Sequence, residues 1–253
     1  MKRIDLNCDM GEMREAVTNG TQESLMPHLT SVNIACGAHA GDSQMMKATI
    51  KQALRWHVAI GAHPGYADRA NFGRVELDIP PRTIADSVFD QIRALAEIAA
   101  RCGASLAHVK PHGALYNQAA KNREIARAVA DGVARWRKDV VLVGLAGSSM
   151  IDVFRDVGFR VAAEAFADRS YESDGGLRSR KFPDALIRDP DQAARQALRI
   201  GKQGKILSVG GKEIEVDAQT ICIHGDTPGA AEIAAAVAQT LRNAGIELRP
   251  LSE

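Results

Sequence analysis

Ile4-Asp5-Leu6-Asn7-Cys8-Asp9 alternates apolar and polar side chains, and it belongs to the first of seven strand-like runs that end in polar residues. A helix-like segment follows six of these runs. Strands that alternate with helices indicate a parallel sheet, and a parallel βα barrel assembles its active site at the carboxyl ends of its strands. We therefore predict an enzyme with a parallel (β/α) barrel of seven strands. The predicted strands are Arg3–Asp9, Ser31–Cys36, His57–Ala62, Ser105–Lys110, Val140–Leu145, Arg160–Ala165 and Thr220–His224.

The helices between these strands carry start and stop signals. Asp42, Ser148 and Asp189-Pro190 are suited to helix starts, and Gly103, Gly158, Gly201 and Gly245 to helix ends. One β-hairpin is expected over 205–216, with a two-residue turn at Gly210-Gly211. Because no linker-like segment interrupts the pattern, we expect a single domain over residues 1–253. The predicted helices are Asp42–Arg55, Pro81–Arg101, Asn122–Arg137, Ser148–Val157, Asp189–Gly201 and Gly229–Ala244.

Composition narrows the class of protein. Hydrophobic residues make up 45% of the 253 residues and aromatic residues only 4%, which suits an aliphatic core of parallel strands under helices. A net charge of +1 gives no electrostatic reason to bind nucleic acid or an anionic membrane. We see neither a signal peptide nor an apolar run of about 18 residues, so we expect a cytoplasmic protein. The four cysteines lack the close spacing of a metal or redox motif and are expected to be buried and reduced.

The alternation in the first strand marks a site, because a buried parallel strand normally reads as continuously apolar. Asp5, Asn7 and Asp9 share one face of the strand, and a charged face is tolerated inside the barrel better than against the helices. Asp9 is expected to act in acid–base chemistry or to bind a metal. Glu12 could do the same or could cap the turn at Gly11. By the same parity, Lys110 shares a face with His108 and His112, and His224 with Cys222 and Asp226.

Histidines and a lysine stand at other strand ends. His39 and His63 follow glycines, which allow a ligand to approach the backbone closely. With Asp9 they could bind a metal, or they could hydrogen-bond a small polar substrate. Lys110 ends an apolar run and is placed to face a carboxylate or phosphoryl oxygen, and His112 can transfer protons near neutral pH.

Two later segments are rich in charge. Glu164, Asp168, Arg169 and Tyr171 lie within eight residues and form either part of the site or a surface salt-bridge cluster. Arg169 is suited to clamp an anion, as are Arg74 and Arg180 in their loops.

After the last strand, Asp226 or Thr227 could cap a helix that has Pro228 in its first turn. The start of that helix could bind an anion, which Asp226 would oppose unless it binds a metal or acts as an acid. No phosphate-binding G-x-x-x-x-G-K-[ST] loop is present.

Seven of these segments together resemble the LamB/YcsF family, whose members act as the A subunit of bacterial 5-oxoprolinase. Three residues depart from the sequence pattern of the family: Val75, Ser179 and Asp184. Ser179 and Asp184 lie next to Arg180 and Pro183, which match the pattern. The segments are Asp5-Leu-Asn-Cys-Asp-Met-Gly-Glu12, Asn33-Ile-Ala-Cys-Gly-Ala-His-Ala-Gly-Asp42, Gly61-Ala-His-Pro-Gly-Tyr66, Phe72-Gly-Arg74, Lys110-Pro-His-Gly-Ala-Leu-Tyr-Asn117, Glu164-Ala-Phe-Ala-Asp-Arg169 and His224-Gly-Asp-Thr-Pro228.

The resemblance implies an irregular seven-stranded barrel similar to polysaccharide deacetylases. It also implies that the ring of 5-oxo-L-proline is opened to L-glutamate in a complex with subunits B and C. ATP, accompanied by Mg²⁺, would be the co-substrate of this reaction. On this hypothesis Lys110 and Arg169 stabilise negative charge, Asp9 or His63 activates water, and His112 protonates the ring nitrogen. The catalytic candidates are thus Asp9, His63, Lys110, His112 and Asp168. The substrate-binding candidates are Asn7, Glu12, His39, Arg74, Glu164, Arg169, Arg180, His224 and Asp226.

Two alternatives remain open. One is an amide hydrolase that acts alone with a metal, for which Asp9, His39 and His63 are the candidate ligands. The other is a non-catalytic protein that binds a carbohydrate or a small acid.

Overall fold

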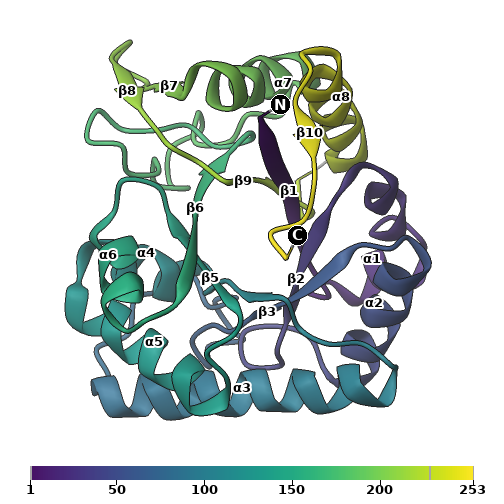
Figure 1. The fold of residues 1–253 in the computed structure, drawn as a ribbon, viewed down its shortest axis with the longest axis vertical. Helices are drawn as coiled ribbons and strands as arrows, with labels where there is room; N and C mark the ends of the chain where they lie inside the picture. The colour runs from purple at the N-terminus through teal and green to yellow at the C-terminus, as the bar shows by residue number, and fades with distance from the viewer. Residues whose placement is uncertain (1, 228, 253) are drawn as a thin grey trace.

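Strand β1 (Arg3–Met10) lies at the seam where the sheet closes on itself (Figure 1). The computed structural model describes residues 2–227 and 229–252, and within them β1 pairs in parallel with both β2 (Ser31–Ala35) and β9 (Thr220–His224). The barrel order is β1-β2-β3-β4-β5-β6-β9. All pairings are parallel, so the predicted barrel of seven strands is confirmed. The remaining barrel strands are β3 (Ala59–His63), β4 (His108–Val109), β5 (Val141–Leu145) and β6 (Arg160–Phe166).

Helices surround the barrel and bury an apolar stripe against it (Figure 1). In α3 (Pro81–Arg101) the buried residues include Ile84, Val88, Ile92 and Leu95, which recur at helical spacing. Helix α3 packs against α5, and α7 packs against α8. Each predicted helix is therefore present, with its ends within a few residues. The other outer helices are α2 (Ser43–Arg55), α5 (Arg123–Trp136), α6 (Ser149–Asp156), α7 (Pro190–Leu198) and α8 (Ala230–Asn243).

The predicted helix starts are confirmed in two cases. The carboxylate of Asp42 accepts hydrogen bonds from the backbone N–H groups of Gln44 and Met45, at 2.9 and 3.0 Å. Asp189 caps α7 through the N–H of Gln192 at 2.7 Å, and Pro190 is its first residue.

Ser148 precedes α6, but its hydroxyl donates to the Leu145 carbonyl, so it does not cap the helix.

Two other predictions about helix ends are wrong. Helix α8 starts after Gly229, whose φ of 79° is left-handed, and neither Asp226 nor Thr227 caps it. Pro228 lies outside the described residues. Gly201 does not end a helix, because α7 continues as a π-helical turn (Arg199–Gln203) that stops at Gly204 with a φ of 66°.

The hairpin over 205–216 is present as a separate antiparallel pair, β7 (Lys205–Leu207) and β8 (Glu213–Glu215) (Figure 1). Its turn is longer than predicted. The N–H of Ser208 donates to the carbonyl of Lys212, which leaves Val209, Gly210 and Gly211 between them.

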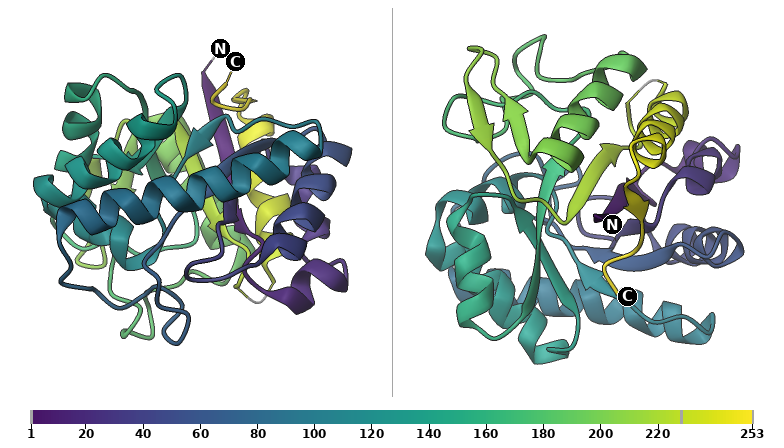
Figure 2. Two further views of the ribbon diagram at one scale, coloured as in Figure 1. Left: turned by 90° about the horizontal axis from the view of Figure 1, so that it is seen from below. Right: turned by 45° about the horizontal axis from the view of Figure 1, so that its top comes forward.

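Some short elements were not predicted. Strand β10 pairs with β1 through Arg3 and Glu247, so segments from the two ends of the chain lie side by side (Figures 1 and 2). None of the helices in the described part of the chain is long and apolar enough to cross a membrane. The additional elements are α1 (Arg14–Thr18), a 3₁₀ helix (Glu23–His28), α4 (Gly113–Lys121) and β10 (Glu247–Leu248).

Candidate active site

A cavity of about 680 Å³ opens at the carboxyl ends of the barrel strands. Asp9, His63, Lys110 and His224, which lie at the ends of four different strands, all line it. Residues far apart in the sequence therefore meet in one cavity at one end of the barrel, as expected from parallel strands. Glu12, Arg74, His112, Arg169 and Arg180 line the same cavity.

Lys110 lies at the floor of this cavity and is 2% exposed. Its ammonium nitrogen is 2.9 Å from Oδ1 of Asp9, 3.0 Å from Oε1 of Glu164 and 3.1 Å from Sγ of Cys222. Burial alone would lower the pKa of Lys110, but the charges of Asp9 and Glu164 raise it well above its usual value. Lys110 is therefore a permanent cation, and it has a fourth acceptor in Oδ1 of Asn7 at 3.3 Å.

The polar face of β1 points into the barrel, as predicted. Asp5 accepts hydrogen bonds from the hydroxyls of Thr30, Ser31 and Thr220. Burial raises the pKa of Asp5 to about 6, although these hydrogen bonds oppose the shift. Asn7 donates to Oε1 of Glu164 at 3.0 Å. The interior of the barrel therefore contains a polar column that rises from Asp5 to the cavity.

Asn33 and His108 extend this column and were not among the predicted site residues. Asn33 donates to Oδ1 of Asp9 at 2.8 Å and accepts from Nε2 of His108 at 2.7 Å. Burial and the nearby Lys110 lower the pKa of His108 to about 3, so this histidine is neutral. The signal for Asn33 was present in the sequence, since Ser31 and Asn33 repeat in β2 the alternation seen in β1.

Gly61 makes room for His108. A Cβ atom on Gly61 would lie 2.1 Å from Nε2 of His108, closer than atoms approach without a bond.

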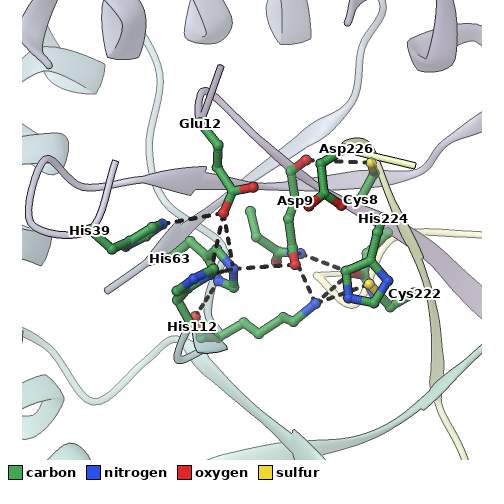
Figure 3. Close-up of polar contacts among 12 residues, drawn as sticks. Cys8, Asp9, Glu12, His39, His63, His112, Cys222, His224 and Asp226 are labelled. Carbon is green, nitrogen blue, oxygen red and sulfur yellow. Dashed lines mark hydrogen bonds and ion pairs between the residues drawn. The ribbon is translucent and has the colours of Figure 1, made fainter. Parts of the chain in front are cut away.

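Three histidines surround the carboxylate of Glu12 (Figure 3). Its Oε1 atom is 3.2 Å from Nε2 of His39, 3.2 Å from Nδ1 of His112 and 4.0 Å from Nε2 of His63. Burial raises the pKa of Glu12, but hydrogen bonds from His112 and His39 outweigh it and hold the pKa well below its usual value. Glu12 is thus an ionised member of the site. Its contacts are with histidines, and the N–H of Gly11 donates to Gln22, so Glu12 does not cap the turn at Gly11.

His63 connects this cluster to Asp9. Its Nε2 atom is 3.3 Å from Oδ2 of Asp9 and 3.1 Å from Nδ1 of His112. Burial raises the pKa of Asp9, but His63 and Lys110 outweigh this and keep it well below its usual value. Asp9 is therefore a carboxylate held between a lysine and a histidine.

His39 lies behind the cavity wall. Its ring stacks on that of His112 with 3.7 Å between centroids, and burial lowers its pKa to about 4. Gly73, with a φ of 62°, permits this stack, since a Cβ there would lie 2.8 Å from Cβ of His39. His39 is 1% exposed, is not among the residues that line the cavity, and contacts Glu12.

The predicted metal ligands are not the set that the structure brings together. Among the described residues, two groups place three ligand atoms within 4.8 Å of one another: Glu12, His63 and His112, and Asp9, Cys222 and His224. His39 belongs to neither group.

Glu164, Asp168, Arg169 and Tyr171 are all buried, so they do not form a surface salt-bridge cluster. Asp168 accepts from the backbone N–H of His224 at 2.8 Å and from its Nδ1 at 2.9 Å. Asp168 is fully buried and does not line the cavity, so its contacts orient His224. The Tyr171 hydroxyl accepts from the Phe166 N–H and has a structural role.

Arginines surround the mouth of the cavity. Arg169 donates to the carbonyls of Ala185 and Arg178, and burial with the nearby Arg180 lowers its pKa to about 10. Asp226 pairs with Arg74 at 2.5 Å and lies 3.7 Å from Arg180. The negative charge of Asp226 is therefore balanced by these arginines. Val75 and Ser179, two of the departures from the family pattern, also line the cavity.

The family model for LamB/YcsF matches residues 4–253. The chain is 50% identical to the 5-oxoprolinase A subunit of Chloroflexus aggregans over 98% of this chain and 99% of that protein. It is 47% identical to the 5-oxoprolinase A subunit of Bordetella pertussis, over 97% and 98%.

Solved structures agree with this relationship. A lactam utilization protein from Thermus thermophilus superposes with a TM-score of 0.90 at 41% identity, covering 98% of this chain and 99% of that one. A family 4 carbohydrate esterase from Streptomyces lividans shares the fold alone, with a TM-score of 0.52 and 11% identity over 98% and 91%. The chain belongs to the LamB/YcsF family.

Proposed function

We propose that this chain is the subunit of an ATP-dependent 5-oxoprolinase in which the lactam ring of 5-oxo-L-proline is opened to L-glutamate. The relatives named as 5-oxoprolinase A subunits support the assignment over nearly the whole chain. The single observation that carries it here is the position of Asp9, ionised between Lys110 and His63 at the floor of a cavity whose mouth carries arginines.

The chemistry explains why ATP is needed. A five-membered lactam is an unstrained amide, and its carbonyl carbon resists attack by water. Phosphorylation of the carbonyl oxygen makes this carbon electrophilic. Water adds to it, the carbon–nitrogen bond breaks as the ring nitrogen takes a proton, and a second water releases inorganic phosphate. We assign the ATP-binding step, with its Mg²⁺, to partner subunits B and C, because this chain has no phosphate-binding loop.

Asp9 is the proposed general base for water. Lys110 and Asn33 bind its Oδ1 atom, which leaves Oδ2 directed at Nε2 of His63. The ammonium of Lys110 already has acceptors in Asp9, Glu164 and Cys222, so we assign it to keep Asp9 ionised and in place. A base held in one orientation contributes more than a mobile one.

His112 is the proposed acid for the ring nitrogen. Its Nδ1 atom faces both Glu12 and His63, so a proton can be held among the three groups. At the mouth of the cavity, Arg74, Arg169 and Arg180 are placed to bind the substrate carboxylate and a phosphoryl group. Asp168 has an indirect role, since it orients His224.

Reconstitution tests the proposal. The purified chain is assayed for glutamate release from 5-oxo-L-proline alone, and then with subunits B and C, ATP and Mg²⁺. We expect turnover only in the complete mixture, and a loss of at least about 100-fold in kcat for Asp9→Asn. The exposed Asp217→Asn is the control and is expected to leave turnover unchanged.

The same assay separates the alternatives. Turnover by the isolated chain without ATP would replace the proposal with a hydrolase that acts alone. Tight binding of 5-oxo-L-proline with no turnover in any mixture would indicate a binding protein. Near-normal turnover of Asp9→Asn would remove Asp9 from its proposed role.

A further inference from the structure

The rings of His63 and His112 face each other, and the far nitrogen of each is already engaged. Nδ1 of His63 lies 2.7 Å from the carbonyl oxygen of Lys110, and Nε2 of His112 lies 2.9 Å from the carbonyl oxygen of Phe72. A carbonyl oxygen can only accept, so both far nitrogens carry hydrogen. The facing nitrogens, Nε2 of His63 and Nδ1 of His112, lie 3.1 Å apart, so either a proton or a metal ion has to join them.

Glu12 supplies the third donor atom. Its Oε1 is 3.2 Å from Nδ1 of His112 and 4.0 Å from Nε2 of His63. Two ligand atoms that are each about 2.1 Å from one metal ion lie about 3.0–3.4 Å apart in octahedral or tetrahedral coordination. Two of the three separations already fit this range, and a small movement of Glu12 toward His63 would bring in the third.

From this arrangement, we propose that Glu12, His63 and His112 bind one divalent transition metal ion at the cavity wall. Two imidazoles and one carboxylate form a donor set that suits zinc, cobalt or manganese and leaves coordination positions open. All three residues line the cavity, so an ion has a path to the site. When bound, the ion would replace the proton that Glu12, His63 and His112 hold in the ion-free site, and it would add a Lewis acid beside Asp9.

The surroundings of the three residues are those of a metal site. Ligating histidines usually donate their other ring N–H to a carbonyl or a carboxylate, as His63 and His112 do here. His39 adds a second support, because its Nε2 lies 3.2 Å from Glu12 and its ring stacks on His112. These contacts fix which nitrogen of each histidine faces the site.

The other group of potential ligands does not need an ion. In the group of Asp9, Cys222 and His224, the ammonium of Lys110 already lies 2.9 Å from Asp9 and 3.1 Å from Cys222. The lysine supplies the positive charge there. Cys222 therefore provides a matched control, being buried and close to the proposed site but not part of it.

The test measures metal binding by the full chain without partner subunits or turnover, so the inference does not rest on the proposed function. Chelator-treated protein is titrated with Zn²⁺ and with Co²⁺ by calorimetry, and bound metal is quantified after desalting. We expect one ion per chain, and a loss of affinity of at least about 100-fold for His63→Ala, His112→Ala and Glu12→Gln. Cys222→Ala should bind as the wild type does.

The cobalt spectrum gives a reading on the unaltered protein, which covers the case in which a histidine variant fails to fold. Nitrogen and oxygen ligands give visible bands without the ultraviolet charge-transfer band of a cobalt–thiolate bond. That pattern supports the proposal. A thiolate band, a loss of binding confined to Cys222→Ala, unchanged affinity in folded Glu12→Gln, or no saturable binding would each overturn it.

Discussion

The ammonium nitrogen of Lys110 lies 3.0 Å from Oε1 of Glu164 in the centre of the barrel, and the side chain of Glu164 is fully buried. Asp9 adds a second carboxylate at 2.9 Å. Two buried carboxylates therefore depend on one lysine for their charge balance.

Replacement of Lys110 should damage the fold as well as the chemistry. We expect Lys110→Met to lower the free energy of unfolding by about 3–5 kcal/mol, because it leaves buried charges without a partner. Lys110→Met combined with Glu164→Gln should be less destabilised than Lys110→Met alone, since one of those charges is gone. Urea unfolding of the wild type, both single variants and the double variant measures the coupling. Equal stability of Lys110→Met and the wild type would contradict the buried charge balance.

Gly61 should not tolerate a side chain while His108 is present. The methyl group of Gly61→Ala would meet the His108 ring at 2.1 Å, so we expect a loss of about 1–3 kcal/mol in unfolding free energy. His108→Ala in the same chain should recover part of this loss. Thermal and urea unfolding of the single and double variants check the coupling, and purely additive losses would show that the ring is not the obstacle.

Asp5 should make stability depend on pH. Its pKa is raised from 3.8 to about 6, so the folded state holds the proton more tightly than the unfolded chain. Its contribution to stability is present at low pH and falls as the pH rises through about 6. Relative to the wild type, Asp5→Asn should gain about 2 kcal/mol in unfolding free energy between pH 4.5 and pH 7.5. Urea unfolding across this range measures the change, with Asp217→Asn as a control. A constant difference between Asp5→Asn and the wild type would disprove it.

Asp226 should compete with an anionic ligand for the arginines at the cavity mouth. Asp226→Asn removes a charge 2.5 Å from Arg74, so we expect inorganic phosphate or 5-oxo-L-proline to bind about two- to fivefold more tightly. Arg74→Gln should weaken the same binding. Calorimetry at low ionic strength compares the wild type, Asp226→Asn and Arg74→Gln. Weaker binding by Asp226→Asn than by the wild type would contradict the prediction and would mean that the Asp226 side chain binds the ligand.

Strand parity was sufficient to predict which residues face the barrel interior. Asp9, Lys110 and His224 were identified because side chains of a strand alternate between two faces. The partners of these residues were not predictable, since the pairing of Lys110 with Glu164 exists only after the barrel has closed. The two-residue strand β10 was missed because it is shorter than the periodicity needed to recognise a strand. Strand β4 was predicted within Ser105–Lys110, but it is only two residues long.

Loop geometry determines contacts of the site that the sequence does not predict. His39 was expected to contact a ligand, but the left-handed turn at Gly73 lets its ring stack behind His112. Asp226 was expected to cap a helix, which is wrong, or to oppose an anion unless it bound a metal or acted as an acid. Its pairing with Arg74 joins two loops at the cavity mouth, and no local sequence pattern encodes it.

The seam between β1 and β9 places the first strand of the barrel against its last. During synthesis, β1 must wait with one edge unpaired until residues 220–224 have emerged. Asp9 and His224 occupy paired positions across this seam, so the site is complete only after residue 224 has been synthesised. A nascent chain that stalls before β9 would expose a polar-lined strand edge, and such an intermediate is a natural target for chaperones.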